Sequence, residues 1–221
     1  MSRPDTRVVV LDIDDTVYLE RDYVRSGFAV VGGLIERRFG VGGVGETLWA
    51  GFLDGVRGDA FDRALRRHGI DAADELVAQL VHAYRCHRPA IRLLPDARHL
   101  LQRLDRAGVR VAAITDGPSS SQRAKVEALG LLDVLDPLVV TAELGEGRGK
   151  PHPAGFELVE QVTGARGGEL MYLADNPGKD FVVPLQRGWR AVRIRRPGSL
   201  HQAVHTPAGV GQICSFTQLE I

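Results

Sequence analysis

Two aspartates separated by one residue follow the first apolar run of the chain, in the order Asp12-Ile13-Asp14-Asp15-Thr16. If this run is a β-strand, Asp12 and Asp14 point the same way. Two carboxylates so close repel each other unless a cation lies between them. Mg²⁺ suits such a place, because it prefers oxygen ligands and keeps several waters. The alternative is an acidic turn whose side chains bond to the following backbone.

A hydroxyl residue ends a later apolar run, as Thr115 in Thr115-Asp116-Gly117. A hydroxyl at a strand end, before the first turn of a helix, suits a phosphoryl oxygen. The free backbone amides and the helix dipole at that place favour an anion. The alternative is an ordinary helix start at Ser119 or Ser120.

Lysine is rare in this chain, which has only Lys125, Lys150 and Lys179 among 28 basic residues. Each lysine is therefore informative, because a specific need for an ammonium would account for its presence. Lys150 stands before Pro151 at the start of a predicted helix, where a fixed positive charge can neutralise a phosphoryl group and carboxylates. The alternative is a solvated surface lysine.

A second acidic pair lies in Ala174-Asp175-Asn176-Pro177-Gly178-Lys179-Asp180. Asp175 follows another apolar run, and it can complete a metal site begun by Asp12 and Asp14. Asp180, expected in the opening of a helix, can orient Lys150 or a metal-bound water. The alternative is a turn with a capping aspartate.

The elements that must bring these residues together alternate between strands and helices. Continuous apolar runs predict parallel strands that are buried on both faces. Segments of helical period lie between them, and most end at a glycine. This alternation predicts a doubly wound, mostly parallel α/β sheet, whose ligands bind beyond the carboxyl ends of the strands. The expected strands cover 8–13, 110–115, 138–141, 170–174 and 190–194, with a short edge strand at 213–216; the expected helices cover 96–107, 119–129, 153–163 and 177–187.

The stretch 17–91 interrupts this alternation, because it contains helical patterns only. It predicts an all-helical insertion in a core made of residues 1–16 and 92–221. Glycines separate its expected helices, which cover 23–39, 46–56, 61–68 and 71–85.

Composition excludes several classes of protein. The 28 basic residues balance the 28 acidic ones, so no basic field is present to bind a nucleic acid. Two distant cysteines, Cys86 and Cys214, indicate no disulfide framework. No apolar run reaches the roughly 18 residues of a membrane helix, so we expect a cytoplasmic protein that does not bind membranes. The sequence leaves the oligomeric state open.

Taken together, these residues resemble the haloacid dehalogenase superfamily in its phosphatase branch. The likeness extends over the whole chain and implies a Rossmann-like core, with the insertion as a helical cap of the C1 type. The family's four motifs are an Asp-x-Asp-x-Thr sequence, a Thr or Ser ending a strand, a Lys and an acid pair. The matching residues are Asp12, Asp14 and Thr16; Thr115; Lys150; and Asp175 with Asp180. Asp116 and His152 depart from the family pattern, since Asn and Asp are common there.

The resemblance implies a Mg²⁺-dependent phosphohydrolase whose substrate is a small phosphorylated metabolite. Asp12 would be the nucleophile that forms an aspartyl-phosphate, and Asp14 the general acid and base. Mg²⁺ would be held by Asp12, Asp175 and the backbone carbonyl of Asp14. The phosphoryl oxygens would be bound by Thr115, Asp116 and Lys150, while Thr16 and Asp180 would support these groups from behind.

Within the family, Asp14 argues against a dehalogenase, which lacks the second acid. The lysine-free insertion disfavours a phosphonatase and a phosphomutase that use a cap lysine, although a mutase stays an alternative. A non-catalytic binding module is another alternative. A third is a metal site of histidines, from His82, Cys86 and His87 or from His201 and His205. The insertion's candidate residues for substrate specificity are Tyr18, Arg21, Tyr23 and Arg25.

Overall fold

The computed structural model describes residues 6–220 and divides into two compact units. Of the described residues, 6–20 and 92–220 form one unit, and Arg21–Ile91 is the other. The segment 17–20, which the sequence pattern assigns to the insertion, therefore lies with the first unit.

The first unit is an α/β unit built on one six-stranded sheet with the strand order β3-β2-β1-β4-β5-β6. All five strand pairings are parallel, which confirms the predicted doubly wound fold. The strands are β1 (Val8–Leu11), β2 (Arg110–Thr115), β3 (Leu138–Val140), β4 (Leu170–Ala174), β5 (Arg190–Ile194) and β6 (Gly211–Ile213).

The central strand β1 is buried along its whole length, as its unbroken apolar sequence predicts. In the parallel register Leu11 lies beside Ala113 of β2 and Leu173 of β4. The backbone amide of Asp12 continues this ladder by donating to the carbonyl of Leu173 at 2.9 Å. Parallel register thus aligns the carboxyl ends of β1, β2 and β4 at one edge of the sheet.

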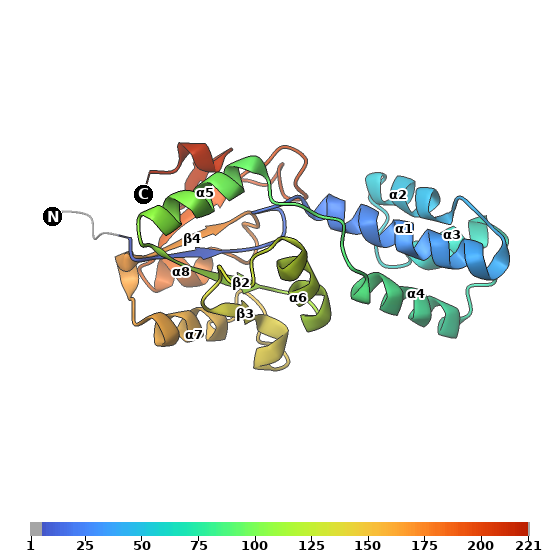
Figure 1. Cartoon of the computed structure of the whole chain (residues 1–221), viewed down its shortest axis with the longest axis horizontal. Helices are drawn as coiled ribbons and strands as arrows, with labels where there is room; N and C mark the ends of the chain where they lie inside the picture. Colours follow the sequence, from blue (N-terminus) through green and yellow to red (C-terminus); the bar gives the residue numbers. More distant parts are fainter. Residues whose placement is uncertain (1–5, 221) are drawn as a thin grey trace. The chain divides into compact units, whose positions relative to one another are not determined.

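Helices cover both faces of this sheet, with α5 (Pro95–Arg106) on one face and α7 (Ala154–Thr163) and α8 (Val182–Gln186) on the other (Figure 1). The core under α7 and α8 includes Phe156, whose ring meets those of Tyr172 and Trp189 edge to face. A further helix, α6 (Ser119–Ala128), follows β2 directly. Three short 3₁₀ helices complete the unit: η1 (Thr141–Leu144), η2 (Gly167–Glu169) and η3 (Phe216–Gln218).

Two predicted elements differ most from those observed, and the bounds of the others agree to within three residues at each end. The helix expected over 177–187 begins only at Val182, because the residues before it form turns. In these turns the Asn176 side chain accepts from the amide of Gly178 at 2.9 Å, and Asp180 accepts from the amide of Asn176 at 2.9 Å. Asp180 therefore lies before the helix. The edge strand expected over 213–216 is shifted to β6, since Ser215 starts η3 instead.

The second unit consists of α1 (Glu20–Phe39), whose first residue lies in the α/β unit, with α2 (Val44–Leu53), α3 (Ala60–Arg67) and α4 (Asp74–Cys86). Its own apolar core includes Phe28, Val31 and Leu48. Glycines allow α1 and α2 to approach closely, because a Cβ on Gly32 would lie 2.8 Å from the backbone nitrogen of Gly45. Among the described residues, no helix is both long and apolar enough to cross a membrane.

Candidate active site

The carboxyl ends of three neighbouring strands meet around Asp12. Asp12 follows β1, Thr115 ends β2 and Asp175 follows β4. All three side chains are buried, at 4%, 0% and 5% exposure. The polar residues found separately along the sequence therefore lie together at the sheet edge where ligands bind in α/β folds.

Lys150 joins this group from the turn before α7. Its ammonium lies 2.6 Å from Asp12 Oδ1 and 2.8 Å from Asp180 Oδ1, and its side chain is fully buried. Burial disfavours a charged ammonium, but Asp12 and Asp180 outweigh this effect, so the pKa of Lys150 lies well above 10.5. Burial raises the pKa of Asp12 to about 6 although Lys150 opposes it. A permanent positive charge thus stands beside the Asp12 carboxylate.

A carboxylate cluster at this edge fits a divalent cation. One carboxylate oxygen from each of Asp12, Asp175 and Asp180 lies within 4.8 Å of the others. Asp175 Oδ2 is buried and has no hydrogen-bond partner, which is costly unless a cation or water meets it. Burial and the charges of the neighbouring aspartates raise the pKa of Asp175 to about 9. These oxygen ligands suit Mg²⁺.

The Asp14 side chain is not part of that carboxylate cluster, in which Asp180 takes part. Its two oxygens accept from Lys125 Nζ at 2.7 and 2.9 Å, and from Gln122 Nε2 at 3.2 Å. The hydroxyl of Tyr18 donates to it as well. Burial by itself raises the pKa of Asp14, but Lys125, Tyr18 and Gln122 hold it below its usual value.

Thr115 and Asp116 have partners that the sequence pattern did not predict. The Thr115 hydroxyl donates to Gln122 Oε1 at 3.1 Å. Asp116 Oδ1 accepts from the Thr141 hydroxyl at 2.8 Å and from the backbone amide of Lys150 at 3.0 Å. Asp116 Oδ2 lies 2.7 Å from Lys179 Nζ. Asp116 therefore ties the loops after β2, β3 and β4 together.

Each of the chain's three lysines pairs with an aspartate at this site. Lys125 pairs with Asp14, Lys150 with Asp12 and Asp180, and Lys179 with Asp116. Sequence reasoning selected Lys150 alone and missed the other two. The rarity of lysine was the available signal, because arginine supplies the positive charge elsewhere in the chain.

The remaining supporting residues fix the backbone around the aspartates. Thr16 is fully buried, and its hydroxyl lies 3.5 Å from Asp12 Oδ2, a long contact. The carbonyl of Thr16 accepts from Arg196 Nε at 2.7 Å. Arg193 donates to the carbonyl of Asp175 at 2.9 Å and is 1% exposed. The loops that carry the carboxylates are thus held from beneath by arginines of the last third of the chain.

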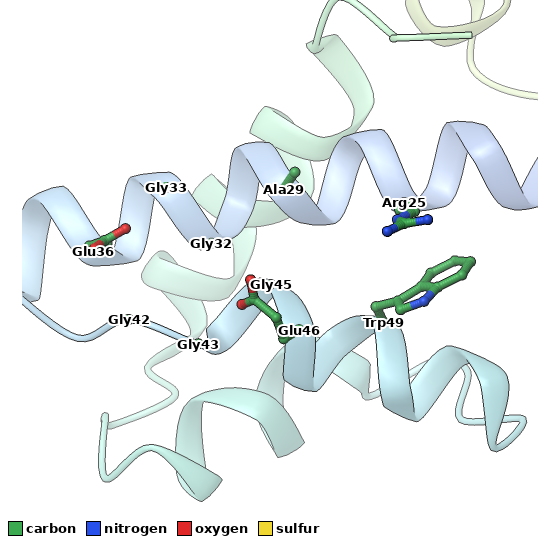
Figure 2. Close-up of a pocket in the computed structure, with 10 residues that line it drawn as sticks. All are labelled: Arg25, Ala29, Gly32, Gly33, Glu36, Gly42, Gly43, Gly45, Glu46 and Trp49. Carbon is green, nitrogen blue, oxygen red and sulfur yellow. The ribbon is translucent and has the colours of Figure 1, made fainter.

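Three of the candidate specificity residues lie in the helical unit, where each contacts an aromatic ring. Tyr23 is buried and packs edge to face on Tyr84, while Arg21 and Arg25 each lie 5.6 Å from the centre of the Trp49 ring. Arg25 and Trp49 border one end of a hollow of about 460 Å³, whose lining includes Glu36, Glu46 and five glycines (Figure 2). Tyr18, by contrast, belongs to the α/β unit and contacts Asp14.

Within residues 6–220, the side chains that gather as potential metal ligands are aspartates of the α/β unit. In the alternative group of His82, Cys86 and His87, the Cys86 Sγ atom lies 3.8 Å from His82 Nδ1 on α4, and Cys86 is exposed. This pair supplies two ligand atoms, whereas a structural zinc ion is bound by four.

The sequence matches the family of haloacid dehalogenase-like hydrolases over residues 6–181. This match covers most of the chain and includes all four groups of the site. The chain belongs to the haloacid dehalogenase-like hydrolase family. The expected family is therefore confirmed, and with it the Rossmann-like core bearing a helical insertion.

Curated relatives of this haloacid dehalogenase-like chain include phosphatases. It is 28% identical to the glyceraldehyde 3-phosphate phosphatase of Methanopyrus kandleri over 198 residues, 86% of this chain and 84% of that protein. It is 31% identical to the phosphoserine phosphatase of Thermus thermophilus over 148 residues, 67% of this chain and 57% of that protein. These relatives support a phosphatase of this family.

Solved structures of the family share the fold at lower identity. A 2-haloacid dehalogenase from Pseudomonas syringae pv. tomato superposes with a TM-score of 0.63 over 96% of both chains, at 22% identity. Because the same fold carries different reactions, this likeness establishes the fold alone. The choice between reactions depends on the side chains at the site.

Proposed function

We propose that this protein is a Mg²⁺-dependent phosphatase that hydrolyses a small phosphorylated metabolite through an aspartyl-phosphate on Asp12. The observation that carries the proposal is the Asp12 carboxylate at the end of β1, 2.6 Å from the buried ammonium of Lys150. Its second neighbour is Asp175, whose buried Oδ2 has no hydrogen-bond partner. The nucleophile Asp12, the fixed ammonium of Lys150 and the Asp175 oxygen that could bind Mg²⁺ thus lie close together.

In the first step an Asp12 oxygen attacks phosphorus in line with the leaving oxygen. The new O–P bond forms as the P–O bond to the substrate breaks, and Asp14 gives a proton to the departing oxygen. The incoming phosphate brings negative charge beside Asp14, which favours its protonated form. In the second step Asp14 takes a proton from water, and that water oxygen displaces Asp12 from phosphorus. The products are the alcohol and inorganic phosphate.

The phosphoryl oxygens need donors that are already in place. Lys150 supplies one once a phosphoryl oxygen replaces one of the partners that fix its ammonium, which are Asp12, Asp180 and the hydroxyl of Tyr172 at 3.0 Å. The Thr115 hydroxyl supplies another once it turns from Gln122. Asp12, Asp175 and Asp180 would hold Mg²⁺, which would offset the repulsion between the anionic substrate and the carboxylates. We assign Asp116 to positioning the Lys150 backbone rather than to direct contact with phosphate.

A dehalogenase is the competing reaction on this fold, and Asp14 argues against it. Displacement of a halide requires no proton for the leaving group, whereas an alkoxide leaves far more readily when it is protonated. Here the second carboxylate is present and is held by three donors. A phosphomutase stays an alternative, although the helical unit lacks a lysine that could serve a second transfer.

Arg21 and Arg25 carry the positive charge that a second anionic group of a substrate would require. Both side chains lie over Trp49 within the helical unit. A panel of phosphorylated metabolites, assayed for released phosphate with and without Mg²⁺, would identify the substrate class.

Removal of the nucleophile tests the proposal directly. Asp12→Asn should lower the turnover of p-nitrophenyl phosphate by at least about a thousandfold, because a carboxamide is a poor nucleophile. Circular dichroism should show an unchanged fold. The control is Asp22→Asn, on the exposed surface of α1, which should keep wild-type activity. Near-normal turnover by Asp12→Asn, with the variant's sequence verified by mass, would overturn the proposed role.

A further inference from the structure

Lys125 is a buried lysine that the reaction described above does not use. It lies on α6, with 5% of its side chain exposed, and its ammonium contacts both oxygens of Asp14. The Asp14 side chain is 20% exposed. The solvent-facing member of the pair is therefore the carboxylate, and the lysine lies behind it.

Gln122 stands one helical turn before Lys125, so both side chains extend from the same face of α6. Its Nε2 donates to Asp14 Oδ2 at 3.2 Å and to the Asp116 carbonyl at 2.8 Å, while its Oε1 accepts from the Thr115 hydroxyl. The partners determine the orientation of the Gln122 carboxamide, because exchanging its nitrogen and oxygen would place the oxygen beside two acceptors. Gln122 thus ties the Asp14 carboxylate to the end of β2.

Tyr18 is the third donor to Asp14, and it comes from the segment after β1 rather than from α6. Donors on two sides leave the carboxylate little rotational freedom, since a bidentate ammonium and two further donors occupy its oxygens. A carboxylate that only needs its charge neutralised requires one cation. Three donors from two separate elements also fix the direction in which the Asp14 carboxylate points.

We propose that Lys125 and Gln122 are positioning residues for Asp14, which hold its carboxylate where it can exchange a proton with the leaving oxygen and with water. This inference rests on the proposed phosphatase function. Lys125 is one of three lysines among the 28 basic residues of the chain, and all three pair with aspartates of this site. Lys125 would act through Asp14 and would not contact the phosphoryl group.

The test compares two substrates that differ in their need for a proton. p-Nitrophenyl phosphate has a good leaving group, whereas phenyl phosphate has a poorer one that depends more on Asp14. Lys125→Met should lower kcat/KM for phenyl phosphate at least about tenfold more than for p-nitrophenyl phosphate. The inhibition constant for inorganic phosphate should change by less than about twofold. Equal losses on both substrates would overturn the inference.

A double-mutant cycle shows whether Lys125 acts through Asp14. In the Asp14→Asn background, Lys125→Met should change kcat/KM for either substrate by less than about twofold. A large further loss there would contradict the positioning role. Arg123→Met is the matched control, because Arg123 lies on the same helix in an exposed pair with Glu143 at 2.7 Å. It should leave both substrates unaffected.

Folding and function can be separated in this experiment. If Lys125→Met does not fold, Lys125→Gln removes the charge but keeps a donor, and a smaller difference between the substrates in the same direction is expected of it. A wild-type protein that hydrolyses neither substrate with Mg²⁺ would contradict the proposed function itself. A wild type active on both, with variants that lose activity equally on both, would contradict the role of Lys125 alone.

Discussion

At the scale of single residues, charge pairs with lysines hold most of the aspartates of the site. Lys150 faces Asp12 and Asp180, and all three side chains are at most 6% exposed. Charges removed from water in this way are tolerated because each has a partner at hydrogen-bond distance. Loss of one partner leaves the others buried without compensation.

Lys150→Met should therefore lower the free energy of unfolding by about 3–5 kcal/mol and abolish phosphatase activity. Urea unfolding in EDTA, followed by circular dichroism, measures the first effect. The exposed pair of Arg7 and Glu169 provides the control, and Arg7→Met should cost less than about 1 kcal/mol. A Lys150→Met protein as stable as the control variant would show that the buried pair contributes nothing net.

At the scale of elements, the turn between β2 and α6 determines where Gln122 lies. Gly117 has a φ of 133°, and a Cβ there would lie 2.5 Å from Gln122 Nε2. The backbone conformation and the approach of Gln122 both favour glycine at this position. A side chain at residue 117 would push the carboxamide away from Asp14 and Thr115.

Gly117→Ala should thus lower kcat/KM for phenyl phosphate about tenfold or more, and it should also destabilise the fold. Gly130→Ala, just after the other end of α6, is the matched control. Gly130 also has a positive φ, of 69°, but a Cβ there would meet nothing within 4 Å. It should cost about 1 kcal/mol of stability while activity is kept. Equal activity of the two variants would contradict the role of the turn.

At the scale of the whole molecule, the cluster of aspartates makes stability depend on pH and on Mg²⁺. Burial and the neighbouring aspartates raise the pKa of Asp175 from its ordinary 3.8 to about 9 in the folded chain. Between these values the folded state binds more protons than the unfolded state, so stability falls as pH rises. A bound cation would reverse this loss, because it stabilises the ionised carboxylates.

We expect Mg²⁺ to raise the melting temperature by several degrees at pH 8 and by less at pH 6, where protons compete for the same oxygens. Asp175→Asn should raise the melting temperature of the metal-free protein at pH 8, since folding would no longer require a carboxyl that is ionised in the unfolded chain to take up a proton. The same variant should lose the response to Mg²⁺. Differential scanning calorimetry with EDTA or Mg²⁺ measures both. If Mg²⁺ raised the melting temperature of Asp175→Asn as much as that of the wild type, the aspartate cluster would be excluded as the Mg²⁺ site.

The sequence by itself determined the sheet, because short unbroken apolar runs alternate with segments of helical period, and this alternation predicts parallel strands covered by helices. Strands β4 and β5 agree with the predicted ranges, and α8 does not. The local bonds of Asn176 and Asp180 form turns where helical period alone predicted a helix. Local polar contacts of this kind override a hydrophobic pattern that is only a few residues long.

The sequence also placed Asp12, Thr115, Lys150 and Asp175 at element ends, since a parallel sheet brings such ends together. It could not assign partners, because these depend on the direction in which each side chain leaves its backbone. Only the tertiary structure placed Lys125 and Gln122, more than a hundred residues away in sequence, against Asp14. Motifs near strand ends are constrained by topology, whereas contacts from a helix face are decided by packing.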